Sequence, residues 1–438
     1  MRKFLIVLLT LLSLGLGIVV AQEPAPNNID FVRPDAPALA AQGDFDIGVQ
    51  TLELVNPDQV DILNTQPDGE TVFYDRPLTV EVWYPAATDG AAPTPYIVGT
   101  RDVDIDATLL GRAVRDAAPD MSAGPYPLII ISHGYPGNRF LMAHLAESLA
   151  TKGYVVVSID HTDSTYVDQN AFGSTLLNRS LDQLFVLNTM AEMGSSDSDN
   201  FLAGLVDADN TGIIGYSMGG YGVVNVVGGG YTEASVAFGF GPPNGLLAAR
   251  QSGTEEYEAT FDDRIKAVIA VAPWGMNVGF WDAEGLAGIE TPIFFMAGSV
   301  DDVSGYEIGT RAIYDLAVNA DRYLLTFENG NHNSGAAMPV PNELLAADSP
   351  FYTHYVDAVW DTARMNNIAQ HFATAFFGVY IKGDETLNEY LDVPVENSID
   401  GVYAVDDAGE FTDEHTYWAG FPARSAVGLR LEHSTPQE

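Results

Sequence analysis

Short apolar runs recur along this chain of 438 residues and are separated by longer segments of mixed composition. One run, residues 78–85 (LTVEVWYP), alternates between apolar and polar side chains and predicts a half-exposed strand. Most of the others are continuously apolar, which is typical of strands buried on both faces: residues 128–132, 155–159, 211–215, 267–272 and 293–297, with residues 324–327 closing the series. Such strands, alternating with helical patterns, predict an α/β fold: a doubly wound, mostly parallel sheet with helices on both faces.

Two segments between or after these runs have helical patterns. Residues 356–380 carry apolar side chains at helical spacing and predict the last large helix. A shorter helix is predicted over residues 181–193. The buried side of the last helix is expected to contain Trp360, Ile368, Phe372, Phe376 and Phe377.

The first 21 residues have the composition of a signal peptide. Arg2 and Lys3 precede an uncharged apolar stretch that ends in small residues, and cleavage is expected after Ala21. The alternative is an uncleaved membrane anchor, because the run is nearly long enough to span a bilayer. The prediction is therefore a secreted or extracytoplasmic protein.

The rest of the chain is divided by changes in composition. Residues 22–44 are rich in Pro, Ala and Asn and are expected to be a flexible lead-in. Residues 45–382 form the predicted α/β domain. Within it, residues 86–125 are interpreted as an insertion, and residues 161–210 as a candidate lid. Residues 383–438 are expected to be an extension that packs on the domain.

Charge and cysteine content narrow the classes of function. The chain has 60 acidic and 19 basic residues, a net charge of −41, and no cysteine. Such a charge disfavours nucleic acid, anionic lipid and strongly anionic substrates. The absence of cysteine excludes disulfides, thiolate zinc sites and cysteine nucleophiles.

Residues 215–219 (GYSMG) match the G-x-S-x-G turn, which exposes a serine hydroxyl between a strand and a helix. The context fits, since residues 211–214 are a predicted strand and an apolar helix start follows the glycines. Glycines are expected beside Ser217 because the turn is strained and tightly packed against neighbouring backbone. Ser217 is therefore the candidate nucleophile.

A serine nucleophile needs a base and an orienting carboxylate, which in this fold follow in the order Ser, Asp, His. Asp301 follows the strand at residues 293–297, and His332 lies in the loop after the next strand. Because the carboxyl ends of parallel strands share one edge of the sheet, these loops are expected to meet at Ser217. Asp302 and Asp282 are the alternatives to Asp301 as the acid.

An earlier strand end, residues 132–137 (SHGYPG), suggests an oxyanion hole. Its donors would be the backbone N–H groups of Tyr135 and of Met218, the residue after the serine. His133 is expected to have a structural role. Tyr135 and Trp274 are candidates for the wall of a substrate pocket, although Trp274 fits core packing equally well.

No metal or organic cofactor is expected. Residues 160–163 (DHTD) match no metal-ligand spacing, and neither a phosphate-binding loop nor a dinucleotide fingerprint is present in the sequence.

These motifs resemble the α/β-hydrolase superfamily, in particular its branch of platelet-activating-factor acetylhydrolases and secreted dienelactone-hydrolase-like serine esterases. The resemblance covers most of residues 72–382 and is carried by RPLTVEVWYP (76–85), YPLIIISHGYPGNR (126–139), GYVVVSIDH (153–161), NRSLDQLFVLNTM (178–190), GYSMGG (215–220) and the Asp301 and His332 loops. Dienelactone hydrolases use a cysteine nucleophile, which this chain lacks. HGYPG followed by GYSMGG also resembles bacterial cutinases and polyester hydrolases.

The resemblance implies hydrolysis of carboxylic esters by a Ser217–His332–Asp301 triad through an acyl-enzyme. Expected substrates are short-chain or hydrophobic acyl esters, including the phospholipid acetyl-ester type. The alternatives are a lipase, a cutinase-like polyester hydrolase, or a catalytically silent binding protein on a hydrolase scaffold. The sequence predicts no oligomeric state.

Overall fold

The computed structural model describes residues 26–169 and 171–437, and the predicted signal peptide lies outside them. The strands of this part of the chain are β1 (Asn27–Asn28), β2 (Ile47–Val60), β3 (Phe73–Ala87), β4 (Tyr96–Gly99), β5 (Asp106–Leu110), β6 (Val114–Arg115), β7 (Ala118–Pro119), β8 (Tyr126–Ser132), β9 (Val155–Asp160), β10 (Val206–Tyr216), β11 (Ile265–Val271), β12 (Ile293–Gly298), β13 (Arg322–Phe327) and β14 (Leu429–Ser434). The helices are α1 (Ala143–Ala150), α2 (Phe172–Gly194), α3 (Met218–Val226), α4 (Glu233–Val236), α5 (Glu255–Glu258), α6 (Ala283–Leu286), α7 (Arg311–Leu316), α8 (Asn342–Ala346) and α9 (Thr362–Tyr380).

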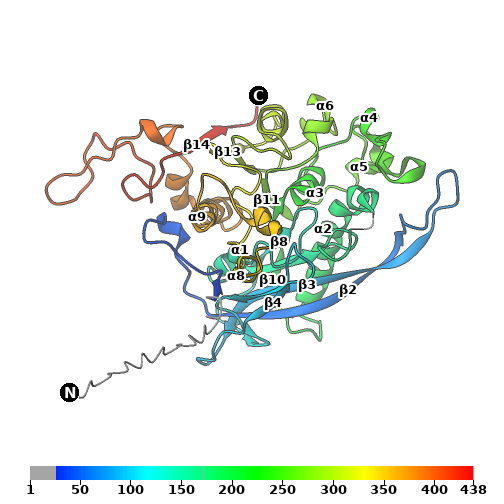
Figure 1. Cartoon of the computed structure of the whole chain (residues 1–438), viewed down its shortest axis with the longest axis horizontal. Coiled ribbons are helices and arrows are strands. Elements are labelled where there is room, and N and C mark those ends of the chain that lie inside the picture. Colours follow the sequence, from blue (N-terminus) through cyan, green and yellow to red (C-terminus); the bar gives the residue numbers. More distant parts are fainter. Residues whose placement is uncertain (1–25, 170, 438) are drawn as a thin grey trace, which may run out of the picture.

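One large sheet organises the molecule (Figure 1). Its strands lie in the order β14-β13-β12-β11-β10-β8-β9-β3-β2-β6, and β7 pairs with β3. The central strands β13, β12, β11, β10, β8 and β9 are parallel to one another. The hairpin of β2 and β3 and the strand β14 add antiparallel edges. This confirms the predicted α/β class with a mostly parallel sheet.

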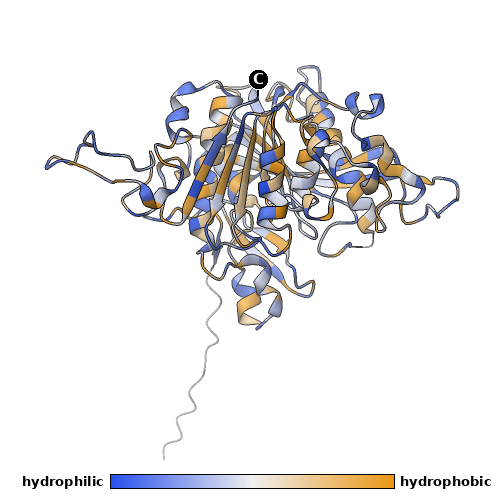
Figure 2. Cartoon of the chain, turned by 90° about the horizontal axis from the view of Figure 1, so that it is seen from above, coloured by the Kyte–Doolittle hydropathy of each residue, from blue (hydrophilic) through white to orange (hydrophobic). Residues whose placement is uncertain are grey.

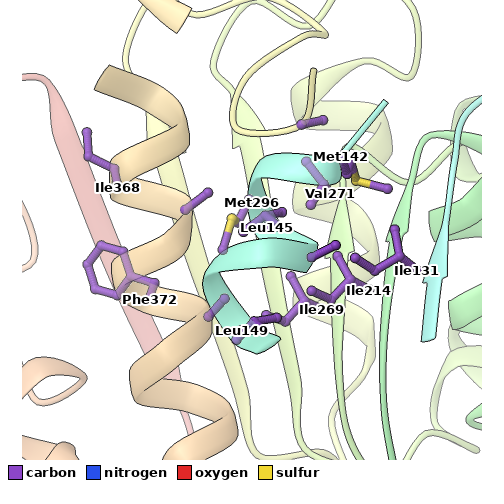
Figure 3. Packing of buried hydrophobic residues seen from close by; sticks show 14 of the residues in the cluster. Ile131, Met142, Leu145, Leu149, Ile214, Ile269, Val271, Met296, Ile368 and Phe372 are labelled. Carbon is purple, nitrogen blue, oxygen red and sulfur yellow. The ribbon is translucent and has the colours of Figure 1, made fainter. Parts of the chain in front are cut away.

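The central strands are buried on both faces, as their continuous apolar runs predicted. Side chains of one strand alternate between two cores: Ile129 and Ile131 of β8 join one, and Ile130 joins the other. The first core lies under α1 and α9 (Figure 3), and the second under α2 and α3. Figure 2 shows these largely apolar strands between helices whose hydropathy alternates. Every second residue thus packs against a different helix layer.

The last large helix is shorter than its pattern predicted. It begins at Thr362 because Asp361 caps it, accepting a hydrogen bond of 2.9 Å from the backbone N–H of Arg364. The five apolar side chains expected on its inner side are buried, although Trp360 precedes the helix.

The segment before the sheet differs from the expected flexible lead-in. In its described part, β1 pairs with β5, and the side chain of Asn27 donates a 2.6 Å hydrogen bond to Glu343. Ala40 is fully buried beside α9. Small side chains allow this close packing but produce no periodic pattern, so the packing could not be predicted from the sequence.

Residues 86–125 contain β4 to β7 and pack against the rest of the molecule. β4 and β5 form a small sheet with β1. Glu147 of α1 holds this segment by accepting hydrogen bonds from the hydroxyl of Tyr96 at 2.5 Å and from the N–H of Arg112 at 2.8 Å. The segment is thereby fixed against α1.

The candidate lid, residues 161–210, also differs from expectation. Its longest element is α2, which contacts β8, β10 and α3, with many of its side chains buried. A helix so deeply packed is a crossover connection of the core, so the lid interpretation does not apply to residues 172–194.

The extension after residue 383 contributes a strand to the main sheet. Within it, β14 pairs with β13 from Arg322 to Phe327. None of the helices among the described residues has the length and apolarity needed to cross a membrane.

Candidate active site

Ser217 lies at the sharp turn between β10 and α3. Its backbone has φ 53° and ψ −112°, a strained conformation for a residue with a side chain. Three hydrogen bonds hold it: its N–H donates to Val271 at 2.8 Å, and its carbonyl accepts from Tyr221 at 2.9 Å and Trp274 at 3.1 Å. The turn therefore presents the hydroxyl at the carboxyl end of the sheet.

The glycines of this turn are required by close packing. A Cβ on Gly219 would lie 1.9 Å from the carbonyl oxygen of Ser132, and one on Gly215 would lie 2.3 Å from the carbonyl oxygen of Gly219. Neither distance is compatible with a side chain, so the predicted reason for glycine holds at both positions.

The three residues predicted to act together are in one hydrogen-bonded row. His332 Nε2 is 3.0 Å from Ser217 Oγ, and His332 Nδ1 is 3.0 Å from both carboxylate oxygens of Asp301. Each residue is 6–8% exposed, so the row is shielded from bulk water but reachable from one side. The loops after β10, β12 and β13 supply one residue each.

The electrostatics of Asp301 favour its ionised form. Burial by itself raises the pKa of this carboxyl, but the hydrogen bond and charge of His332 and the N–H groups of Val303 and Ser304 outweigh burial and lower the pKa. An ionised Asp301 accepts the Nδ1–H of His332, which leaves the Nε2 lone pair facing the serine hydroxyl.

The alternative acids occupy other positions. Asp302 is exposed at the cavity, and among the described residues no hydrogen bond joins it to His332. Asp282 caps α6 by accepting a 2.9 Å hydrogen bond from the N–H of Gly285. Of the three carboxylates considered, the structure brings Asp301 to the histidine.

The expected oxyanion donors flank the serine. Met218 is the first residue of α3, and Tyr135 lies in the loop after β8. Within the described chain, neither backbone N–H donates a hydrogen bond to a protein acceptor. His133 beside them is fully buried, with Nδ1 2.6 Å from the carbonyl of Gly134, in keeping with a structural role.

A cavity of about 490 Å³ opens over the serine and the histidine. Tyr135 lines it as predicted, whereas Trp274 does not. The ring of Trp274 packs instead against Phe172, whose other neighbour is Tyr135, so it supports the wall from behind. The lining consists of Arg101, Tyr135, Pro136, Tyr216, Ser217, Asp302, Val303, Asn331, His332, Asn333, Phe351, Thr353 and His354.

The site residues do not form a metal centre. Across residues 26–169 and 171–437, no group of three or more His, Asp or Glu side chains is arranged to hold a metal ion.

Several known proteins are similar to this chain. Residues 88–238 match the sequence model of a family described as PET hydrolase-like, a range that includes most of the segment interpreted as an insertion. Cutinase est1 of Thermobifida alba is 24% identical over 208 residues, 47% of this chain and 53% of that protein. Cutinase cut1 of Thermobifida fusca is 22% identical over 221 residues, 50% of this chain and 53% of that protein. The chain thus spans about half the length of these curated relatives.

The fold has a solved counterpart over most of its length. The structure of a ferulic acid esterase from Streptomyces cinnamoneus superposes with a TM-score of 0.54 at 20% identity, covering 81% of this chain and 96% of that one. The fold of this chain is thus that of an α/β-hydrolase. This confirms the resemblance at the level of the fold.

One buried network beside the site was not predicted. Arg76 Nε donates to Asp182 Oδ1 at 2.9 Å, Asp182 Oδ2 is 2.9 Å from His161 Nδ1, and His161 Nε2 is 2.8 Å from Ser132 Oγ. It runs beneath the loop that carries Tyr135. A signal was present, since Asp182 is a charged residue among the apolar positions of a core helix.

Proposed function

We propose that this α/β-hydrolase is an enzyme that hydrolyses carboxylic esters through Ser217, His332 and Asp301. The observation that carries the proposal is the hydrogen-bonded row, with His332 Nε2 3.0 Å from Ser217 Oγ and Nδ1 3.0 Å from Asp301. Similarity to cutinases and to a ferulic acid esterase supports the same class of reaction.

The first half of the reaction forms an acyl-enzyme. His332 Nε2 takes the proton of Ser217 Oγ as this oxygen attacks the ester carbonyl carbon. The carbonyl oxygen becomes an oxyanion between the N–H groups of Tyr135 and Met218, each worth roughly 3 kcal/mol to the transition state. The bond to the alcohol oxygen then breaks, and His332 gives its proton to the departing alcohol.

The second half returns the enzyme to its starting state. A water molecule gives a proton to His332 and attacks the acyl carbon, and the tetrahedral intermediate collapses with release of the carboxylic acid. The proton on Nε2 returns to Ser217 Oγ. Asp301 remains ionised throughout and stabilises the imidazolium.

A fluorophosphonate probe tests the nucleophile directly. The full-length protein should be labelled and Ser217→Ala should not. Absence of labelling in the wild-type protein, with correct folding shown by circular dichroism, would favour the catalytically silent binding protein instead.

Short-chain or hydrophobic acyl esters are the proposed substrates, because Tyr135, Val303 and Phe351 give the cavity apolar walls. A cutinase-like polyester hydrolase is the second candidate, favoured by the PET hydrolase-like match. Rates on short soluble esters, an acetylated lysophospholipid, long-chain esters and a polyester film separate these substrates.

Export through a signal peptide is also proposed, on the pattern of residues 1–21. Secretion of the full-length chain, followed by amino-terminal sequencing that begins at Gln22, would support it. Retention of residues 1–21 on a membrane-bound product would favour the anchor.

A further inference from the structure

Arg101 places a guanidinium group in the wall of the cavity that contains Ser217 and His332. Within residues 26–169 and 171–437 this group makes no ion pair, no hydrogen bond and no stacking contact with a ring, and its Nη1 is fully buried. Several other arginines of this acidic chain are paired, for example Arg76 with Asp182 and Arg139 with Glu81. Arg250 also has buried guanidinium nitrogens without a partner among the described residues, but it does not line this cavity. An unpaired guanidinium at the site therefore indicates a ligand with an anionic group that pairs with it.

The groups around Arg101 do not neutralise it. The titratable side chains near Arg101 include those of Tyr135, Tyr166, Tyr355 and His354. Burial first, and the charge of Arg101 second, lower the pKa of His354 to about 3, so this histidine is neutral at ordinary pH. Asp302 lines the same cavity but forms no ion pair with Arg101.

The backbone around Arg101 is held in place. Its N–H donates to the hydroxyl of Tyr355 at 2.9 Å, and the carbonyl of Gly99 accepts a 2.8 Å hydrogen bond from Asn138. On the other side, the carboxylate of Asp102 accepts from the hydroxyl of Ser349 at 2.6 Å. A ligand that binds the guanidinium would thus lose little binding free energy to ordering the loop.

We infer that this cavity binds esters whose acyl or alcohol part carries a carboxylate, and that Arg101 is the residue that binds it. A guanidinium presents paired N–H donors that match the two oxygens of a carboxylate. At about 490 Å³, the cavity holds one small molecule, so the carboxylate and the scissile carbonyl would belong to the same ester. The inference rests on the proposed function and narrows its substrate class.

The inference reverses one expectation from composition. A net charge of −41 disfavours anionic ligands over the surface as a whole. Inside a partly buried cavity, however, an unpaired cation can contact the ligand directly, whereas the surface carboxylates act from a distance and Asp302 of the same cavity is exposed to screening solvent.

Two pairs of esters test the inference kinetically. The first pair places the charge on the acyl part: the monomethyl ester of adipic acid and methyl hexanoate. The second places it on the alcohol part: 4-acetoxybenzoate and 4-methylphenyl acetate. For at least one pair, Arg101→Gln should lower the ratio of kcat/KM, charged over neutral, by about tenfold or more, and Arg101→Lys should restore part of it. Lys266→Gln, the same charge change on the exposed start of β11, should leave the ratio unchanged.

A binding measurement separates this inference from the proposed function. Benzoate, a carboxylate without an ester, should bind to the wild type and to Ser217→Ala in calorimetry, and at least tenfold more weakly to Arg101→Gln. If all four esters are inert but benzoate binds through Arg101, the proposed function fails and the carboxylate site stands. Ratios and benzoate affinity that do not respond to Arg101→Gln would overturn the inference.

Discussion

Arg179 Nη1 donates a hydrogen bond of 2.6 Å to the carbonyl oxygen of His133. The bond fixes the backbone two residues before Tyr135, whose N–H is a proposed oxyanion donor. Arg179→Met should therefore lower kcat by about tenfold with little change in KM, since the transition state alone develops the oxyanion. Steady-state kinetics on a short ester measure this, and Arg179→Lys should recover part of the loss. A change in KM alone would argue against a positioning role.

Removal of the nucleophile or the base should abolish turnover without unfolding the protein. Ser217→Ala and His332→Ala should each lower kcat by roughly 10⁴- to 10⁶-fold, and the double variant should be little worse than either. Ester hydrolysis by purified variants gives the rates, and thermal unfolding provides the control. Additive losses in the double variant would mean that the two residues do not act as a unit.

The adjacent carboxylates Asp301 and Asp302 form a matched pair. Asp301→Asn should reduce kcat by about 10³- to 10⁴-fold, because an amide cannot hold the imidazole in the productive tautomer. Asp302→Asn should retain most activity, since this exposed side chain makes no hydrogen bond to His332. If Asp302→Asn is the more damaging, the assignment of the acid is wrong.

The serine turn should be intolerant of a single methyl group. Gly219→Ala places a Cβ 1.9 Å from the carbonyl oxygen of Ser132, so either the turn shifts or the protein loses stability, by about 3 kcal/mol or more. Gly239→Ala is the control, since a Cβ there has no neighbour within 4 Å. Denaturant unfolding and activity should separate the two variants; equal behaviour would contradict the packing.

Acid should weaken the protein through Asp182. Burial by itself raises the pKa of this carboxyl, but Arg76 and the hydrogen bond from His161 outweigh burial and lower the pKa to about 2. Because the folded pKa lies below the unfolded value of 3.8, the carboxylate stabilises the fold above about pH 4, and this contribution is lost as the pH falls towards 2. The loss amounts to about 2 kcal/mol of the free energy of unfolding.

Asp182→Asn tests this account. At pH 7 the variant should be less stable by about 3–5 kcal/mol, since Arg76 is left buried without its partner. Urea unfolding between pH 7 and 2 should show the difference from wild type shrinking by about 2 kcal/mol below pH 4. A difference that stays constant with pH would show that Asp182 does not titrate with folding.

Much of the sheet could be predicted because its strands are buried on both faces, which leaves a local signature such as residues 128–132. The edge strands were missed. β14 carries Arg430 and Glu432 on its outer side, and β2 is interrupted near Asp58, whose backbone has φ 54°. Edge strands are defined by pairing with distant segments, which a local pattern does not contain.

The triad positions could be predicted because each follows a recognisable strand, and the topology of parallel strands brings their ends together. Arg101 could not. It reaches the cavity because its loop is bonded to Tyr355, far along the chain. For Trp274 the sequence left a pocket wall and core packing open, because its backbone contacts Ser217 whereas its ring turns towards Phe172.

Because β13 pairs with β14, the main sheet can be completed only after the segment that forms β14 has been synthesised. Residues 322–327 emerge from the ribosome well before residues 429–434, and until the later segment arrives the hydrogen-bonding groups along one side of β13 have no strand to meet. In a nascent or truncated chain that ends before Leu429, β13 would therefore be an exposed edge strand. Such an edge can pair with strands of other molecules.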